Sequence, residues 1–354
     1  MLCEEAPLGD VDLEGVEASE ADVTDCPRMV TQAERLYHLH FSERACRIAR
    51  RAYSLDPYNW RCLSVYIAAL TDMEYKTELF YLGHELVESY PKMALTWYAV
   101  GCYYWCCRKL ELAQKHFQRS TKIDKKFALA WVALGVVLSA QEETEHALSA
   151  FRTSCRLLPG KHQPMLFLAK ELARTSNQTL ALQILQGALD IADDDILVLN
   201  EMGVIYLQQH RLEDAQRCLL RAASLITSHA SIKSPHDFIV LNNAGTSLRK
   251  SGRLGEALEW YRRSLRVRPG DASTHANIAF TLHLQHNVLE AVEAYHRALS
   301  LQPGLSFCAE MLSRAMEDVL DREDEGEALF NEASMSVESA YSDPLTFDDS
   351  IERV

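Results

Sequence analysis

The chain has 354 residues, of which 48% are hydrophobic and 24% are charged, so it can bury a core and is not disordered throughout. Its formal net charge of -14 comes from its two ends, because residues 1–30 carry -8 and residues 321–354 carry -9. The middle of the chain is left at +3. So small an excess argues against a nucleic-acid-binding surface, and the acidic ends would repel phosphate.

Residues 1–30 and 321–354 are acidic, poor in large apolar residues and without pattern, which predicts two disordered tails around a domain at 31–320. The start, MLCEEAPLGD, has neither the basic nor the apolar region of a secretory signal. The longest uncharged stretch, residues 127–141, is shorter than the ~18 residues that cross a membrane, so no membrane is expected as a partner. The ten cysteines show no disulfide spacing, which favours a reducing compartment.

A 34-residue period organises the middle of the chain. Small residues recur 34 apart, with one expanded spacing of 42, at Gly101, Gly135, Ala169, Gly203, Gly245 and Ala279. Alanine stands twelve positions after each of them, at Ala113, Ala147, Ala181, Ala215, Ala257 and Ala291. A large apolar residue stands sixteen positions after each, at Phe117, Phe151, Leu185, Leu219, Tyr261 and Tyr295. This pattern is too regular to reflect composition.

The pattern predicts one antiparallel helix pair per period. The two backbones approach closely where both side chains are small, and the large side chain fills the space beside that contact. Proline closes three units, at Pro159, Pro269 and Pro303, because it cannot continue a helix. These features are typical of the tetratricopeptide repeat. The predicted fold is therefore all-α, a right-handed solenoid of antiparallel helix pairs.

Weaker marks extend the period upstream, to Leu63 and Pro91 in one unit and to Ala45 and Pro57 in another. We therefore predict about seven units over residues 26–305, the first of them incomplete. A helix at residues 307–320 is predicted to cap the stack, because a terminal repeat must cover its apolar face. The expanded spacing predicts a polar loop at 228–237, in which Ser234 precedes a proline and is a candidate phosphorylation site.

The sequence shows no recognisable catalytic constellation. It contains no glycine-rich phosphate loop, GxSxG or HExxH motif, so we expect no enzyme activity and no cofactor. The best metal candidate is Cys102, Cys106 and Cys107 with His116 on the next helix. Free cysteine is among the most buried residue types and no second paired motif accompanies these residues. No metal site is predicted.

The first helices of the pairs are expected to line a concave groove that binds a peptide. The repeat register predicts a largely apolar end at Tyr98, Trp105, Val132, Val136 and Leu166, with the cations Lys170 and Arg174 beside it. It predicts a polar end at Asn200, Glu201, Val204, Asn242, Asn243, Thr246, Arg249, Lys250, Asn277 and Phe280. Flanking positions in the same register are Cys102, Cys106, Ser139, Ala173, Gln208 and His283.

The polar end suits an extended peptide, since asparagine amides pair with peptide backbone and the cations with acidic side chains. A structural alternative stays open for Asn242 and Asn243, which would instead brace neighbouring helices. Apolar anchors at one end and backbone-reading groups at the other suit a partner that is partly helical and partly extended.

Several strings go beyond the generic repeat, among them ELFYLGHELVESYP (78–91), TWYAVGCYY (96–104), QPMLFLAKELA (163–173) and VLNNAGTSLRK (240–250). With GEALEWYRRSL (255–265), they closely resemble the tetratricopeptide subunit-six family of the anaphase-promoting complex, in its C-terminal half. The resemblance runs from about Asp56 to Glu317.

This resemblance implies a non-catalytic structural subunit of a ubiquitin ligase that drives mitotic exit, in nucleus and cytoplasm. It implies two kinds of partner: a small peptide-like subunit held in the groove, and other tetratricopeptide subunits of the complex. Family members normally have further repeats ahead of this region that form a homodimer. An acidic segment stands there in this chain, which leaves homodimerisation open. Ala169 and His275 also depart from the usual glycine and aromatic residue.

Two other functions fit the sequence less well. A generic co-chaperone-type adaptor would need paired lysines and asparagines that clamp a carboxylate, and Asn200, Asn242 and Asn243 lack the lysines in register. A tetratricopeptide domain of a glycosyltransferase would need a second domain, and none is expected after Leu320.

Overall fold

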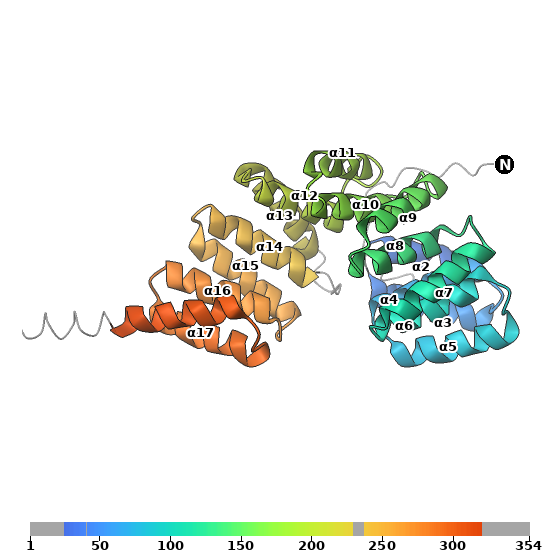
Figure 1. Ribbon diagram of the computed structural model, residues 1–354, viewed down its shortest axis with the longest axis horizontal. Helices are drawn as coiled ribbons and strands as arrows, with labels where there is room; N and C mark the ends of the chain where they lie inside the picture. The colour runs from blue at the N-terminus through green and yellow to red at the C-terminus, as the bar shows by residue number, and fades with distance from the viewer. Residues whose placement is uncertain (1–24, 40, 229–236, 321–354) are drawn as a thin grey trace, which may run out of the picture. The chain divides into compact units, whose positions relative to one another are not determined.

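The computed structural model describes residues 25–39, 41–228 and 237–320, and these residues form helices but no strands (Figure 1). The helices are α2 (Cys26–His38), α3 (Ser42–Leu55), α4 (Trp60–Asp72), α5 (Lys76–Ser89), α6 (Ala94–Cys106), α7 (Leu110–Ile123), α8 (Ala128–Ala140), α9 (Thr144–Leu157), α10 (Gln163–Arg174), α11 (Gln178–Leu189), α12 (Ile196–Gln208), α13 (Leu212–Ser228), α14 (Asp237–Lys250), α15 (Leu254–Val267), α16 (Ala272–Leu284) and α17 (Val288–Leu301). Residues 306–320 are also helical, where the capping helix is predicted. None of these helices is long and apolar enough to cross a membrane.

The helices from α2 to α17 form eight pairs, in which the even-numbered helix is called A and the odd-numbered helix B. The predicted number of seven is therefore wrong for the described residues. The first pair is complete because α2 begins at Cys26, with Pro27 in its first turn, and buries Met29 and Val30. Residues 26–30 consequently belong to the folded part, and the predicted tail boundary at residue 30 lies too far along the chain.

The chain divides into two compact units, residues 1–240 and 241–354. The first unit holds the helices from α2 to α13, and the second holds most of α14 with α15, α16 and α17. In the first unit each A helix contacts the B helix of its own pair and the A helix of the next pair. The A helices therefore form a continuous row in that unit.

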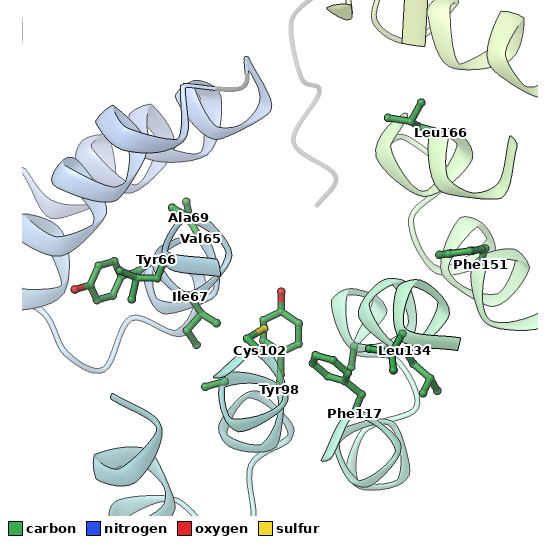
Figure 2. Close-up of a cluster of buried hydrophobic side chains, with 14 of the residues drawn as sticks. Val65, Tyr66, Ile67, Ala69, Tyr98, Cys102, Phe117, Leu134, Phe151 and Leu166 are labelled. Atoms are coloured by element: carbon green, nitrogen blue, oxygen red, sulfur yellow. The ribbon is translucent and has the colours of Figure 1, made fainter. Parts of the chain in front are cut away.

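The predicted contact between a small and a large residue is confirmed. A Cβ atom added to Gly135 would lie 2.5 Å from Cε1 of Phe151, and one added to Gly203 would lie 2.4 Å from Cγ of Leu219. The alanines twelve positions after the small residues, from Ala113 to Ala291, are all 0% exposed. Figure 2 shows the large side chains Phe117 and Phe151 in the cluster of buried side chains.

The turn between the A and B helices of a pair repeats with the same period. Its residue with positive φ is Glu74, Arg108, Glu142, Ser176, His210, Gly252 or His286. Only one of the seven is glycine, although glycine adopts this backbone region most readily. Glycine positions therefore do not predict this turn, and only the 34-residue period shows where it lies.

Tyr261 and Tyr295 offer a test of this packing, because they occupy the same repeat position and both are 0% exposed. The Tyr261 hydroxyl lies 3.1 Å from Oγ1 of Thr246, whereas the Tyr295 hydroxyl has no partner among the described residues. We expect Tyr261→Phe to lower the free energy of unfolding by about 1 kcal/mol, and Tyr295→Phe to leave it unchanged or raise it slightly. Urea unfolding of both variants measures this. Equal losses would show that the Tyr295 hydroxyl has a partner.

Candidate peptide-binding face

The residues predicted to line the groove are called the A-helix face. Its apolar end lies on α6, α8 and α10 and is more buried than the register suggests. Tyr98 is 6% exposed and Leu166 is 4% exposed. The ring of Tyr98 packs against the rings of Phe117 and Phe127, 5.9 and 5.5 Å away between ring centres. Trp105, Val132 and Val136 are half-buried. Tyr98 and Leu166 therefore offer almost no surface to a ligand.

Part of this end is covered by α2, the first helix that the structure describes. Tyr37, from α2, is half-buried near Tyr98 and Cys102, and desolvation together with the charge of Asp72 and a hydrogen bond to it raises the Tyr37 pKa well above the usual range. Oγ of Ser42 also donates to Oδ2 of Asp72, at 3.2 Å. The contact of Tyr37 with the apolar end is not among the contacts predicted from the sequence. The period could have found it, because Tyr37 stands two periods before Trp105.

The end of α2 also reaches the segment ahead of α10. The rings of His38 and His162 lie 6.4 Å apart, and Nζ of Lys161 lies 3.3 Å from Nε2 of His38. Nε2 of His162 lies 2.9 Å from Oδ2 of Asp195, whose other oxygen accepts from the backbone N–H of Val198 at the start of α12. Helix α2 is thereby tied to two later repeats, and the apolar end of the face is partly closed by the chain itself.

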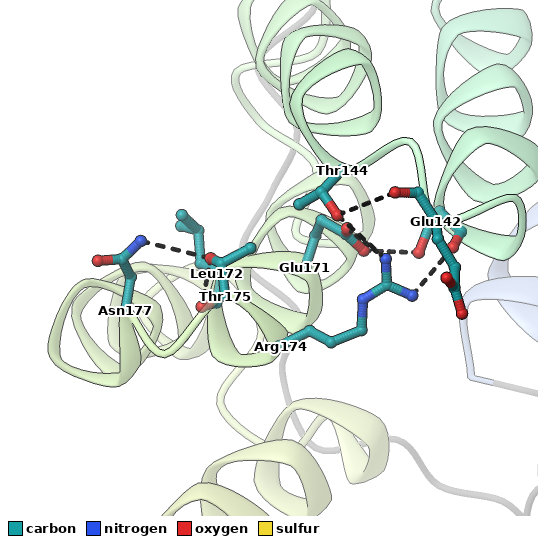
Figure 3. A network of polar contacts seen from close by, with 8 residues as sticks. Glu142, Thr144, Glu171, Leu172, Arg174, Thr175 and Asn177 are labelled. Carbon is teal, nitrogen blue, oxygen red and sulfur yellow. Dashed lines mark hydrogen bonds and ion pairs between the residues drawn. The ribbon is translucent and has the colours of Figure 1, made fainter.

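Arg174 forms a polar network between helices (Figure 3). Its Nη1 donates to the backbone oxygen of Ser139 at 2.9 Å, and its Nη2 donates to Oε1 of Glu171 at 3.0 Å and to Oγ1 of Thr144 at 3.3 Å. Oγ of Ser139 donates to Oε2 of Glu171 at 2.5 Å. The Glu171 side chain is 3% exposed, so Arg174 supplies the counter-charge of a buried carboxylate.

Lys170 and Glu201 pair with each other across α10 and α12, with Nζ 3.2 Å from Oε1. Asn200 is 3% exposed, and its Nδ2 lies 3.5 Å from the same Glu201 oxygen. Val204 is half-buried one turn further along α12. These predicted residues thus lie close together, but the charges of Lys170 and Glu201 pair with each other within the chain.

In the second unit, α14 and α16 present the rest of the polar end. Nδ2 of Asn277 donates to Oδ1 of Asn242 at 2.9 Å, which favours the bracing role for Asn242. Oγ1 of Thr246 donates to the backbone oxygen of Asn242 at 3.0 Å. The Arg249 guanidinium lies 4.9 Å from the centre of the Phe280 ring. Asn243 is half-buried and Lys250 is exposed.

Two polar nitrogens of this unit are buried beside Phe280 and Tyr295 without a hydrogen-bond partner in the described part of the chain, as is the Tyr295 hydroxyl. They are Nε of Arg249 and Nδ1 of His283, while Nε2 of His283 lies 2.7 Å from Oδ2 of Asp318. The His283 ring lies 6.3 Å from the Tyr295 ring. Buried polar groups nearly always have partners, so a water or a ligand group gains a hydrogen bond at each of these atoms.

The candidate metal ligands are not brought together. Burial raises the pKa of the Cys102 thiol to about 12 and that of the Cys106 thiol to about 11, so both remain protonated at neutral pH. His116 stacks between the rings of Trp97 and Tyr104. No group of three or more potential ligands occurs in the described ranges. Ser234, residues 1–24 of the first predicted tail and the second predicted tail at 321–354 lie outside those ranges.

Known proteins resemble this chain at two levels, first in the repeat and then in a particular family. Residues 194–269 match the family model described as the tetratricopeptide repeat. The chain is 33% identical to the human cell division cycle protein 16 homolog over 82% of this chain and 47% of the relative. It is 37% identical to anaphase-promoting complex subunit 6 of Arabidopsis thaliana over 74% of this chain and 48% of the relative.

Among solved structures, the chain resembles one described as the APC/C hetero-tetramer Cut9–Hcn1, with a TM-score of 0.74 and 26% identity. The match covers 86% of this chain and 57% of the other. The chain spans about half the length of the curated relatives it matches. The predicted fold and the predicted resemblance are both confirmed. The fold is of the tetratricopeptide-repeat type, and the chain resembles, over about half of their length, the subunit-six proteins of the anaphase-promoting complex.

Proposed function

We propose that the chain is a non-catalytic scaffold subunit of the anaphase-promoting complex, acting with other tetratricopeptide subunits in the nucleus and cytoplasm. The observation that carries the proposal is the 37% identity to anaphase-promoting complex subunit 6 over 74% of this chain. A row of packed A helices, as in the first unit, supports a scaffold, because such helices present a long surface to partners.

The scaffold is proposed to hold a small peptide-like subunit on the A-helix face. The solved relative is named with a second protein, Hcn1, which supports a partner of this kind. In this chain the second unit is the favoured part of the face, because Arg249 has a buried unpartnered Nε and Lys250 is exposed. Phe280 adds a half-buried ring beside them. An acidic extended segment would satisfy both cations.

The co-chaperone alternative has less support from this geometry. A carboxylate clamp needs cations that are free to meet a peptide terminus. Lys170 and Arg174 instead pair with Glu201 and Glu171 inside the chain.

Co-purification at native abundance tests the proposal. The tagged chain is expected to recover a small subunit together with other subunits of the complex, identified by mass spectrometry. Arg249→Gln with Lys250→Gln is expected to reduce recovery of the small subunit about tenfold, the loss of roughly one charge-assisted contact of ~1.4 kcal/mol, while the other subunits are retained. Arg262→Gln with Arg266→Gln, two exposed arginines of α15, is the matched control.

Recovery of neither the small subunit nor any other subunit would refute the scaffold role. Equal loss of the small subunit in the control pair would refute the use of this face, and melting temperatures of both variants separate binding from folding. Discharge of ubiquitin from a loaded conjugating enzyme by the purified chain alone would refute the non-catalytic part.

A further inference from the structure

A second surface, which shares only α6 with the A-helix face, lies on α5, α6 and α7, the cyan to green helices of the first unit (Figure 1). Six aromatic side chains follow one another there, with neighbouring ring centres between 5.1 and 5.7 Å apart. In order they are Tyr81, Phe80, Tyr103, Tyr104, His116 and Trp97, and we call them the aromatic ladder. Trp97 is buried and Tyr103 and Tyr104 pack against the core, so the fold accounts for the inner part of the row but not for its exposed outer end.

The outer end of the ladder is strongly exposed. Tyr81 is 67% exposed and Phe80 is 45% exposed, although both rings lie on the same turn of α5. On α7, Leu112 is 38% exposed and stands one turn before His116. Single exposed apolar residues are ordinary, but Phe80 and Tyr81 lie against each other, and neighbouring exposed apolar side chains of this kind favour an interaction site.

Cations border the ladder on α7. The side chains of Lys109, Lys115, Arg119 and Lys122 are exposed, and none of the four forms an ion pair with a described residue. The guanidinium of Arg119 lies 3.4 Å from the centre of the Trp97 ring. Glu111 is the one acidic residue in α7. The border therefore carries an excess of unpaired positive charge.

The ring geometry favours a peptide over a nucleic acid. Unstacked bases bind proteins by stacking on free aromatic faces. The two faces of His116 are already covered by Trp97 and Tyr104, with interplanar angles of 4° and 5°. Arg119 covers the Trp97 ring as well. The ring edges and the exposed side chains of Phe80 and Tyr81 are left to contact a ligand, and they pack well against aromatic or aliphatic side chains.

We propose that the aromatic ladder and its cationic border bind an acidic peptide segment of another protein, one that carries large apolar side chains between its acids. The apolar side chains pack on Phe80, Tyr81 and Leu112, and the carboxylates meet Lys115 and Lys122. Because the cations are exposed, binding weakens as salt is raised.

The test measures fluorescence polarisation of the full chain with three labelled twelve-residue peptides, which repeat Glu-Glu-Phe, Glu-Glu-Ser or Lys-Lys-Phe. The Glu-Glu-Phe peptide is expected to bind at least tenfold more tightly than the other two. Lys115→Glu with Lys122→Glu is expected to weaken it at least tenfold, and Phe80→Ser with Tyr81→Ser about fivefold. Arg262→Glu with Arg266→Glu makes the same charge change on α15 and is expected to have no effect.

Melting temperatures are measured for every variant, and exposure of the replaced side chains predicts that they stay close to that of the parent chain. Equal binding of the Glu-Glu-Phe and Glu-Glu-Ser peptides would overturn the role of the ladder. Equal weakening by the α15 control would overturn the site, leaving only general charge attraction. Tighter binding of a single-stranded oligonucleotide of twelve thymidines would overturn the peptide in favour of a nucleic acid.

Discussion

Gly135→Leu is expected to lower the free energy of unfolding by about 2–4 kcal/mol, because it overpacks the contact on which each repeat depends. Even the first added atom, a Cβ, would lie 2.5 Å from Cε1 and 2.7 Å from Cδ1 of Phe151. The Phe151 side chain is 2% exposed and stacks on Phe167, 5.9 Å away between ring centres, so it has little freedom to move aside. Urea unfolding of the full chain measures the loss.

Gly83→Ala is the matched control, since Gly83 also lies within a helix of the first unit. A Cβ there meets Cγ2 of Val100 at 3.6 Å, an ordinary contact. The control is expected to stabilise the chain by about 0.5–1 kcal/mol, because alanine forms helix better than glycine. A Gly135→Leu chain as stable as the parent would contradict the close approach of α8 and α9.

The next repeat has the same contact, but with a larger residue in place of the glycine and a smaller side chain opposite it. At the equivalent positions of the next repeat, Ala169 and Leu185 replace the glycine and the phenylalanine, and both are 0% exposed. We therefore expect Gly135→Ala to be tolerated better with Phe151→Leu than alone. A double-mutant cycle measures this coupling, expected to be about 1 kcal/mol, and purely additive effects would contradict direct packing between the two positions.

The fold could be predicted from the sequence because its defining contacts are local in the repeat. Gly135 and Phe151 stand sixteen residues apart and meet within one helix pair, so the same pattern recurs in each period. The sequence marks six units by a small residue and two more by weaker marks upstream, which makes eight, so the predicted number of seven undercounts the pattern itself. Pro27 and the buried Met29 show how α2 nevertheless begins within the predicted tail.

The candidate site could be predicted only as a face. Register places Tyr98 on the A-helix row, but it does not show that Tyr37 covers it, since that contact joins residues 61 positions apart. Charge composition identifies Lys170 as a cation available to a partner, whereas its distance of 3.2 Å to Glu201 depends on how two successive A helices pack. Which side chains pair between neighbouring repeats depends on how the repeats stack in space, and the spacing of residues along the sequence does not predict it.

Arg174→Leu is the second large effect that we expect, a loss of about 2 kcal/mol in the free energy of unfolding. Removing one partner of a buried ion pair leaves the other charge uncompensated, which costs about 3–5 kcal/mol in full burial. The Arg174 side chain is 45% exposed, so solvent reduces the cost at this site. Glu171 would retain the hydroxyl of Ser139 as a hydrogen-bond donor.

Glu171→Gln in the same chain is expected to restore most of the lost stability, because a neutral amide needs no counter-charge and can still accept from Ser139. Arg262→Leu, at an exposed arginine of α15, controls for the loss of one surface charge and should change stability by less than about 0.5 kcal/mol. The same variants decide what Arg174 does. If Arg174→Leu left stability intact and instead reduced recovery of the small subunit, its network with Glu171 would be incidental and Arg174 would contact the partner. A stability loss rescued by Glu171→Gln, with partner recovery rescued in parallel, assigns Arg174 to holding α8, α9 and α10 together beneath the face.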